Sequence, residues 1–504
     1  MKYLQIVLNI PLNQTFTYSW EASEKLPPEE TPETGKRAEV RFGNRKMTGF
    51  IVSISDKIPE DCPVSAEKIR SVTKIIDKEP LFTPEIYEFA VWISRYYICS
   101  IGEAAFSIIP SRAKREVSCP GFSFEDDITA KTANQLSDEQ INAVNSVLKS
   151  AETGNVSYHY LYGPTGTGKT EVFLQCAEWF LNKGKGVIYL VPEIGLTPQV
   201  VKAVTARFGN TAAVLHSGLT PSQKLSEWRR IMHKEARIVV GARSAVFAPV
   251  PDLGMIIIDE EHDGSYKSGE TPRYHARQAA MHRCSALGIP LLMGSATPSV
   301  EAWQLMKTGR LIRHTLTKRL AGGAMPKIHV IDLSKTENSG CISEELADEI
   351  RKTVEHKKQT ILFLNRRGFT HFFRCNSCGY EIKCKNCSVP MTYHKAENRL
   401  RCHYCGWSIQ PPSSCPKCSS LDVGYSGFGT EYIETETRAK FPNAKIIRID
   451  TDALTKKGEL QEKLDSFRNG EYDIMLGTQM VAKGLNFPKL QLVGVVLADT
   501  GLHM

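Results

Sequence analysis

The chain has 504 residues, 41% hydrophobic and 23% charged, with a formal net charge of +8. Its length predicts three or four domains, and its charge permits nucleic-acid binding without arguing for it. No apolar run approaches the roughly 18 residues that a membrane span needs, and the N-terminus has no signal-peptide pattern. We therefore expect a cytoplasmic protein with no membrane partner.

The first part of the chain is predicted to be β-rich and then helical. Segments of β-branched and aromatic residues lie between Gly and Pro punctuation, so residues 1–75 should form strands, at TFTYSW (15–20), RAEVRF (37–42) and TGFIVSI (48–54). Apolar residues at helical spacing then predict helix from 83 to about 110. A polar stretch from Arg112 to about Leu136 is predicted to be a linker.

From Ser137 the sequence predicts an α/β fold. Ser137 and Gln140 form a capping box that should open a helix. Short apolar runs then alternate with helices, which is typical of a parallel sheet covered on both faces; they span 157–162, 186–191, 237–242, 255–259 and 290–295. A second series is interrupted by a block of cysteines and lies at 360–365, 473–478 and 492–499.

A GxxxxGKT motif lies between a predicted strand and a predicted helix. Its glycines let backbone N–H groups wrap phosphates, and the helix N-terminus adds partial positive charge. Lys169 should reach the β- and γ-phosphates of ATP, and the Thr170 hydroxyl should join a Mg²⁺ shell. The predicted nucleotide-binding residues are Gly163, Pro164, Thr165, Gly166, Thr167, Gly168, Lys169 and Thr170.

The segment MIIIDEEH (255–262) ends a predicted buried strand in acidic residues. Acids at a strand end are usually only solvated charge, but a phosphate-binding loop upstream favours a catalytic interpretation. Asp259 is the candidate to hold Mg²⁺, and Glu260 is the candidate to orient or deprotonate the attacking water. With Lys169, these two acids are the predicted catalytic residues.

Eight of the fourteen cysteines lie in four CxxC units between Cys375 and Cys418. This clustering indicates metal rather than disulfides, and four thiolate pairs make two closed structural Zn²⁺ sites. Three pairings are possible. We favour nesting because the 14-residue gap from Cys387 to Cys402 is close to a zinc-ribbon spacing. The predicted ligand sets are Cys375, Cys378, Cys415 and Cys418, and Cys384, Cys387, Cys402 and Cys405.

The cysteine block is also basic. From Arg374 to Lys417 there are seven Lys or Arg against two Asp or Glu, with four Tyr or Trp among them. This mixture suits single-stranded DNA or a protein partner, although a solvated basic face is the alternative. His394 and His403 are possible ligands, but eight thiols already satisfy two metals.

The order of motifs resembles superfamily 2 helicases, from GPTGTGKTEVF through DEEH and GSATPS (294–299) to GTQMVAKGLNFP (477–488). The resemblance implies that the segments 215–219 and 239–249 touch the nucleic-acid backbone. It also implies that GSATPS couples the nucleotide to the strand. Gln140 lies where such proteins place an adenine-reading Gln, with a surface Gln as the alternative.

The zinc block inside the second lobe, with DEEHDGSYK and RYHARQAA, is similar to the bacterial primosomal, replication-restart helicases. The resemblance implies a monomeric ATP-dependent 3′→5′ DNA helicase that recognises stalled or abandoned forks and single-stranded DNA. Primosome proteins and single-stranded-DNA-binding protein would be its partners. It implies two RecA-like P-loop lobes, with a β-rich N-terminal domain, a winged helix and a two-zinc insertion.

The resemblance also implies the domain boundaries of the chain. They are a 3′-end DNA-binding domain at 1–75, a winged helix at 76–115, a linker at 116–136, helicase lobe 1 at 137–325, helicase lobe 2 at 326–373 and 419–504, and the zinc insertion at 374–418.

The resemblance also makes residues 263–277 an aromatic-rich loop that couples DNA binding to ATP hydrolysis. Four of its side chains should offer stacking planes and phosphate contacts, namely Tyr266, Arg273, Tyr274 and Arg277.

Alternatives remain open at this point. An RNA helicase or a double-strand translocase could use the same two-lobe core, and a catalytically dead scaffold could bind forks through its other modules. Such helicases also end their second lobe in an arginine-rich motif, which does not occur after Asp499. We therefore expect an incomplete second lobe and weak ATP hydrolysis by this chain.

Overall fold

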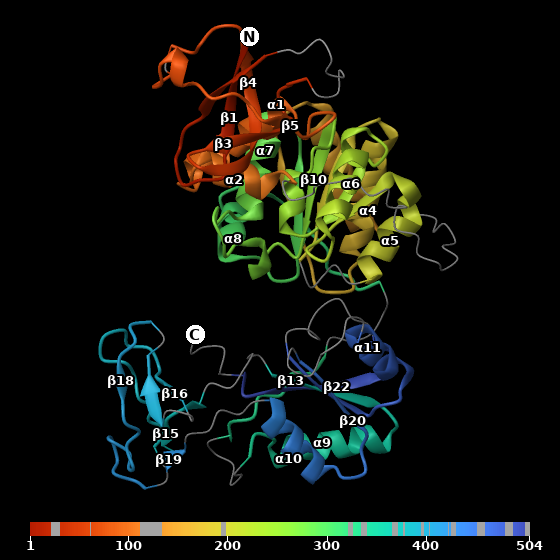
Figure 1. Ribbon diagram of the computed structural model, residues 1–504. Coiled ribbons are helices and arrows are strands. Elements are labelled where there is room, and N and C mark those ends of the chain that lie inside the picture. The colour runs from red at the N-terminus through yellow and green to blue at the C-terminus, as the bar shows by residue number, and fades with distance from the viewer. Residues whose placement is uncertain are drawn as a thin grey trace. The chain divides into compact units, whose positions relative to one another are not determined.

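The computed structural model describes residues 1–21, 31–60, 62–110, 134–192, 198–320, 326–333, 340–364, 371–375, 378–394, 398–402, 404–421, 423–424, 430–450, 459–478 and 487–498 (Figure 1). The chain forms two compact units, residues 1–324 and 325–504, which are described separately. Most of the predicted linker lies outside the described residues. Within the described ranges, no helix has the length and apolar character needed to cross a membrane.

The N-terminal strands form one antiparallel sheet in the order β2-β1-β4-β3-β5. Alternation along β1 places Ile6 in a core on one face of the sheet and Val7 in a larger core on the other. The predicted β-rich region is confirmed, with strands β1 (Lys2–Leu8), β2 (Phe16–Trp20), β3 (Arg37–Phe42), β4 (Arg45–Ser55) and β5 (Lys74–Ile75).

The predicted helix from 83 to about 110 is two helices, α1 (Pro84–Tyr96) and α2 (Ile101–Ile108). Ile98 between them has φ 53, a left-handed conformation that ends the first helix. Ser100 and Glu103 then form a capping box that starts the second. Periodicity alone does not reveal this break, because apolar residues continue across it.

Both helices pack against lobe 1 as well as against the N-terminal sheet. Val7 and Phe89 share one buried cluster with residues of the lobe 1 sheet. The Trp228 indole donates a 2.7 Å hydrogen bond to the Leu81 carbonyl, and Arg283 forms a 2.9 Å ion pair with Glu85. The N-terminal region and lobe 1 are therefore joined by a buried interface within one unit.

Lobe 1 holds a parallel sheet of order β12-β6-β11-β10-β7-β9-β8. This confirms the predicted parallel sheet and adds β8 and β12, two strands that the sequence did not predict. The strands are β6 (Tyr158–Tyr162), β7 (Gly186–Leu190), β8 (Ala212–Leu215), β9 (Ile238–Gly241), β10 (Leu253–Asp259), β11 (Leu291–Ser295) and β12 (Ile312–Thr315).

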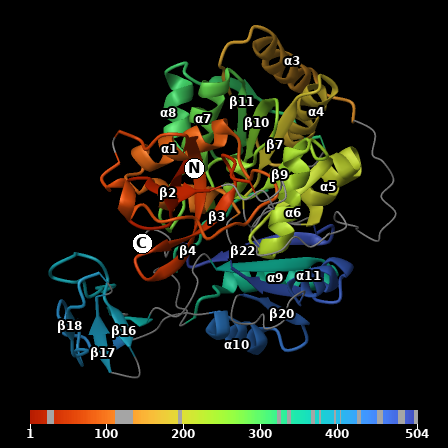
Figure 2. The ribbon, with the colours of Figure 1, turned by 45° about the horizontal axis from the view of Figure 1, so that its top comes forward.

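Helices cover both faces of this sheet, and Figure 2 shows α4 and α7 on opposite sides of it. One apolar core lies beneath α3 (Asp138–Glu152), α4 (Lys169–Asn182) and α5 (Pro198–Phe208). The other lies beneath α6 (Pro221–Met232), α7 (Ala276–Leu287) and α8 (Val300–Lys307), together with α1 and α2. Burial on both faces explains the unbroken apolar runs.

The second unit holds a parallel sheet of order β20-β21-β13-β22. Two buried clusters cover its faces. In its last strand, Val493 and Val495 are 54% and 51% exposed. The elements are α9 (Glu344–Glu355), β13 (Gln359–Leu364), α10 (Thr430–Lys440), β20 (Ile446–Ile449), α11 (Glu459–Asn469), β21 (Ile474–Gly477) and β22 (Leu490–Val496).

The cysteine block forms two small antiparallel sheets between β13 and α10. Phe373, Met391 and Leu400 make its small apolar core. One sheet contains β14 (His371–Phe372), β16 (Thr392–His394), β17 (Arg399–Arg401) and β18 (Ser408–Ile409), and the other pairs β15 (Arg374–Cys375) with β19 (Val423–Gly424).

Candidate active site and metal centres

The phosphate-binding loop connects the end of β6 to the start of α4. Gly166 and Gly168 have φ +83 and +77, which side-chain-bearing residues rarely adopt, so the glycines permit this turn. The Lys169 ammonium donates to the carbonyls of Gly163 and Pro164 at 2.8 and 3.0 Å. Lys169 therefore spans the concave side of the loop, where the phosphates of a nucleotide would lie.

Burial lowers the pKa of Lys169, and the nearby carboxylates of Glu260 and Asp259 partly offset that effect. The two acids come close to this lysine because β6 and β10 run parallel on either side of β11. Their carboxyl ends therefore meet at one edge of the sheet, where open α/β sheets bind ligands.

Asp259 is the last residue of β10, and two tyrosines fix its position. The Tyr189 hydroxyl donates to the Asp259 carboxylate at 3.1 Å, and the Tyr266 hydroxyl donates to the Asp259 carbonyl at 2.6 Å. Burial and the neighbouring Glu260 carboxylate raise the pKa of Asp259 to about 6. A buried carboxylate of this kind suits a divalent cation, whose charge would offset the cost of burial.

Glu260 has φ 45, a strained conformation for a residue with a side chain. The Ser295 hydroxyl donates to the Glu260 carboxylate at 3.0 Å, and the ring nitrogen Nδ1 of His262 lies 2.7 Å from the same hydroxyl. Because the serine proton is given to Glu260, His262 must donate at Nδ1. Ser295 belongs to GSATPS, so this motif holds the second acid directly.

Glu261 is a buried member of the site that the sequence analysis left without a role. It is 1% exposed and forms an ion pair with Arg277. The Ser299 and Tyr160 hydroxyls donate to its carboxylate at 2.7 and 3.2 Å. Only its place in DEEH could have signalled this role, because its partners are 16 to 101 residues away.

The loop at 263–277 is packed differently from the prediction. Tyr266, Tyr274 and Arg277 were expected to offer stacking planes and phosphate contacts, but they are 1%, 4% and 5% exposed. The Tyr266 hydroxyl donates to the Asp259 carbonyl, and Arg277 forms an ion pair with Glu261. The Tyr274 ring packs against Phe247, with 4.8 Å between the ring centroids. Of the four predicted residues, Arg273 alone is exposed.

Gln140 is 1% exposed, so the surface alternative is wrong. Its amide oxygen accepts from the Ser137 backbone N–H at 2.8 Å, and its amide nitrogen donates to the carbonyls of Thr167 and Gly168 at 3.1 and 3.3 Å. Gln140 therefore supports the phosphate-binding loop, and contact with adenine stays a prediction.

The eight clustered cysteines gather into two groups, each with its four sulfurs within 4.8 Å of one another. The groups are the nested ones, Cys375, Cys378, Cys415 and Cys418, and Cys384, Cys387, Cys402 and Cys405. Sulfur–sulfur distances of 3.5 and 3.6 Å occur in the first group and 3.5 Å in the second.

These distances fit zinc rather than disulfides. A disulfide needs about 2.05 Å, whereas a tetrahedral Zn²⁺ with ligands at about 2.3 Å separates its sulfurs by about 3.8 Å. The Trp407 backbone amide helps lower the pKa of Cys405 to about 6, which favours the zinc-binding thiolate. His403 and the His394 side chain lie outside what the structure describes.

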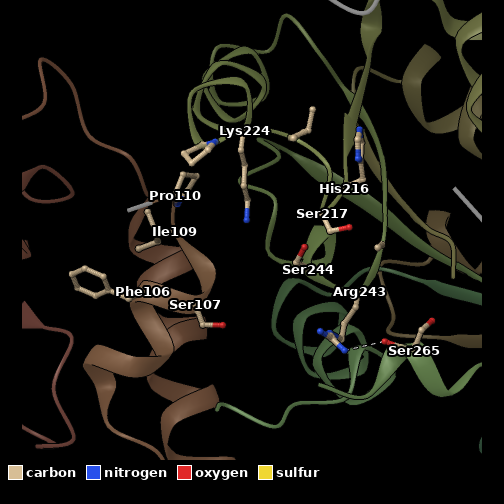
Figure 3. Close-up of a pocket in the computed structure, with 13 residues that line it drawn as sticks. Phe106, Ser107, Ile109, Pro110, His216, Ser217, Lys224, Arg243, Ser244 and Ser265 are labelled. Atoms are coloured by element: carbon tan, nitrogen blue, oxygen red, sulfur yellow. Dashed lines mark hydrogen bonds between the residues drawn. The ribbon is translucent and has the colours of Figure 1, made fainter. Parts of the chain in front are cut away.

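A separate pocket of about 360 Å³ lies between the end of α2 and lobe 1 (Figure 3). Its polar wall includes His216 and Ser217, which follow β8, and Arg243 and Ser244, which follow β9. Lys224 reaches toward it from α6. The wall thus draws on both segments expected to touch a nucleic-acid backbone.

Four family profiles match the chain. They are the 3′ DNA-binding domain of PriA at 5–110, a DEAD/DEAH box helicase domain at 137–305, the Cys-rich region of PriA DNA helicase at 384–409, and a helicase conserved C-terminal domain at 417–503. The fold and the site therefore define a DNA helicase with RecA-like lobes. The Cys-rich profile and the two Cys₄ clusters add a zinc-binding insertion.

The chain belongs to the PriA family of replication restart helicases. It is 48% identical over 504 residues to replication restart protein PriA of Treponema pallidum, covering 99% of this chain and 75% of the relative. Identity to the Haemophilus influenzae protein is 33%, covering 100% and 77%. Identity to the Bacillus subtilis protein is 44%, covering 76% and 48%.

Proposed function

We propose that this chain is an ATP-dependent 3′→5′ DNA helicase that acts at stalled or abandoned replication forks and starts replication again by primosome assembly. The observation that carries the proposal is the meeting of Lys169 with the acids of DEEH at one edge of the lobe 1 sheet. Family membership supplies the fork as the substrate.

The proposed chemistry is hydrolysis of ATP. Water attacks the γ-phosphorus, the bond to the β–γ bridging oxygen breaks, and ADP and phosphate leave. Lys169 and the backbone N–H groups of 165–170 neutralise the phosphate charge. Asp259 and the Thr170 hydroxyl would hold Mg²⁺, which supplies further charge stabilisation when bound. Glu260 accepts the proton of the attacking water.

Single-stranded DNA would pass the pocket of Figure 3. Lys224 and Arg243 are suited to phosphate oxygens, and Ser217 and Ser244 supply hydroxyl donors. Residues 1–75 would take the 3′ end of the nascent strand, and 76–115 would act as the winged helix. Each Cys₄ group would hold one structural Zn²⁺, because four thiolates leave no open position for catalysis.

Primosome proteins and single-stranded-DNA-binding protein are the proposed partners, and the basic, aromatic face of 374–418 is a candidate surface for them or for DNA. The protein is proposed to act as a monomer in the cytoplasm.

Strand separation on tailed duplexes tests the direction of movement. Strand separation should depend on ATP and be confined to a duplex with a 3′ single-stranded tail, leaving one with a 5′ tail intact. Lys169→Ala should separate neither. Equal separation of both duplexes, or separation by Lys169→Ala, would contradict the proposal.

A further inference from the structure

The loop at 263–277 positions the catalytic acids from its inner side. The Tyr266 hydroxyl holds the Asp259 carbonyl at 2.6 Å. The Arg277 guanidinium, at the start of α7, holds the buried Glu261 carboxylate. A displacement of this loop would therefore move the carboxyl end of β10, where the reaction occurs.

The outer side of the loop rests on the N-terminal domain, taken as residues 5–110, the range that matches a 3′ DNA-binding domain. Tyr97 follows α1, and its hydroxyl accepts a 3.1 Å hydrogen bond from the His275 backbone N–H. The Lys267 ammonium lies 5.4 Å from the centre of the Tyr97 ring, within range of a cation–π contact. An isolated antiparallel β-bridge pairs the backbones of Lys267 and His275, the two loop residues that Tyr97 contacts.

The path from Tyr97 to the acids is short. The ring nitrogen of His275 accepts from the Arg277 backbone N–H at 3.2 Å, and Arg277 binds Glu261. Tyr97 is thus linked to DEEH through one ion pair and two hydrogen bonds, each from a backbone N–H to a side-chain atom. The path lies within a single compact unit.

Lobe 1 holds the same loop from a second direction. The Arg243 guanidinium donates to the carbonyls of Ser265 and Lys267 at 3.1 and 2.6 Å. It also lies 5.6 Å from the centre of the Tyr274 ring. Arg243 lines the pocket of Figure 3, so the loop is clamped between that pocket and the N-terminal domain.

We propose that Tyr97 is a positioning residue through which the DNA-bound state of the N-terminal domain sets the geometry of the nucleotide site. The N-terminal sheet contributes Val7 and Phe50 to the same rigid core as α1, so a shift of the sheet is transmitted to Tyr97. The inference rests on the proposed function in one respect, namely that the N-terminal domain binds the DNA of a fork.

The test is the mutual influence of DNA and nucleotide binding, which requires no turnover. The Kd of a fluorescent non-hydrolysable ATP analogue with Mg²⁺ is measured with and without forked DNA that has a 3′ end at its branch point. Fork DNA should tighten nucleotide binding by the wild-type chain roughly fivefold or more. This ratio of the Kd without DNA to the Kd with DNA is called the fork effect. Tyr97→Phe removes one hydrogen-bond acceptor and should reduce this factor by roughly two- to tenfold.

Tyr97→Phe should keep the wild-type Kd for the analogue in the absence of DNA, because it touches no nucleotide. Tyr96→Phe is the matched control, since Tyr96 is the neighbouring tyrosine and is 55% exposed, and it should behave as wild type. Lys267→Gln, which changes an exposed side chain on the other side of the contact, should reduce the fork effect in the same direction.

Three results would overturn the inference. The first is a Tyr97→Phe variant with the same fork effect as the wild type, and the second is a wild type with no fork effect. The third is a Tyr97→Phe variant that binds the nucleotide equally more weakly with and without DNA. Strand separation judges the proposed function independently. A chain that separates 3′-tailed duplexes while Tyr97→Phe keeps the full fork effect would retain the function and lose the inference.

Discussion

Two adjacent carboxylates at the end of β10, those of Asp259 and Glu260, lie near the buried ammonium of Lys169. Burial disfavours ionisation of Asp259, and the neighbouring Glu260 carboxylate adds to the effect, which is why the pKa of Asp259 is raised to about 6. At neutral pH the protein therefore carries a buried negative charge that reduces its stability. The site accepts this cost because a charged Asp259 is what a Mg²⁺ ion requires.

Asp259→Asn should stabilise the protein at pH 7 to 8 while abolishing ATP hydrolysis. The folded-state pKa of about 6 lies above the ordinary aspartate value of 3.8, so ionisation costs at most about 3 kcal/mol at neutral pH. The cost is absent below pH 4, where the carboxyl is protonated in both states. The gain in melting temperature over the wild type should therefore grow as pH rises from 4 to 6.

Thermal unfolding of both chains across this pH range, without nucleotide or Mg²⁺, is the measurement. Comparing the two chains at each pH cancels the titration of all other groups. A gain that is equal at pH 4 and pH 7, or a variant less stable at pH 7, would contradict the assigned cause of the raised pKa.

Gly168→Ala should weaken nucleotide binding at least tenfold. An added Cβ at Gly168 would lie 2.4 Å from the Gln140 amide nitrogen, at φ +77, and would displace the residue that supports the loop. Gly154→Ala is the matched control because Gly154 has φ +67 with nothing within 4 Å of the added carbon. Both variants incur about 1–2 kcal/mol of backbone strain.

Equilibrium binding of a fluorescent ATP analogue separates the two variants. Gly154→Ala should lose stability but keep the wild-type Kd. Equal Kd values for the two variants would show that the space around Gly168 does not matter for the nucleotide site.

At the scale of single elements, the local motifs could be predicted and their surroundings could not. The GxxxxGKT loop, DEEH and the four CxxC units are short sequence patterns with a direct chemical meaning, so the sequence located them. The burial of Tyr266 and Tyr274 depends on partners that the chain brings together only after folding. An aromatic residue next to a basic one looks the same in a DNA-binding loop and in a buried clamp.

Strand prediction shows the same division. Strands with runs of large apolar residues, such as β7, β10 and the four-residue β9, were predicted. Half of β8 is alanine and β12 (IRHT) is largely polar and exposed, so neither strand has such a run. The break between α1 and α2 depends on the capping box at Ser100 and Glu103. That signal is present in the sequence, but continuous apolar periodicity concealed it.

The zinc insertion gives a prediction at this scale. The chain should bind two Zn²⁺ ions, and each should contribute strongly to folding of the insertion. Cys384→Ser and Cys402→Ser should release the same ion, because the two sulfurs belong to one group. Cys375→Ser should release the other ion. Cys341→Ser, a buried cysteine outside both groups, is the control and should retain both.

Metal content measured by mass spectrometry, with a colorimetric chelator to follow release, gives the number directly. The nested grouping would be contradicted if Cys375→Ser and Cys384→Ser lost one shared ion, or if the wild-type chain bound a single ion.

At the scale of the whole molecule, the described parts of the nucleotide site lie in the unit formed by residues 1–324. That unit also contains the match to a 3′ DNA-binding domain, at residues 5–110. A DNA-binding module and an ATP-hydrolysing lobe thus share one continuous apolar core. This shared core gives the DNA-binding module a physical route to the acids of the nucleotide site.

We propose that DNA, specifically forked DNA, controls ATP hydrolysis by this chain. The most direct measurement is the steady-state rate of ATP hydrolysis with forked DNA, with RNA of the same sequence, and with no nucleic acid, using Lys169→Ala as the control. We predict stimulation by forked DNA, little by RNA, and no hydrolysis by Lys169→Ala despite undiminished fork binding. Equal stimulation by RNA, or hydrolysis that is indifferent to DNA, would contradict the account.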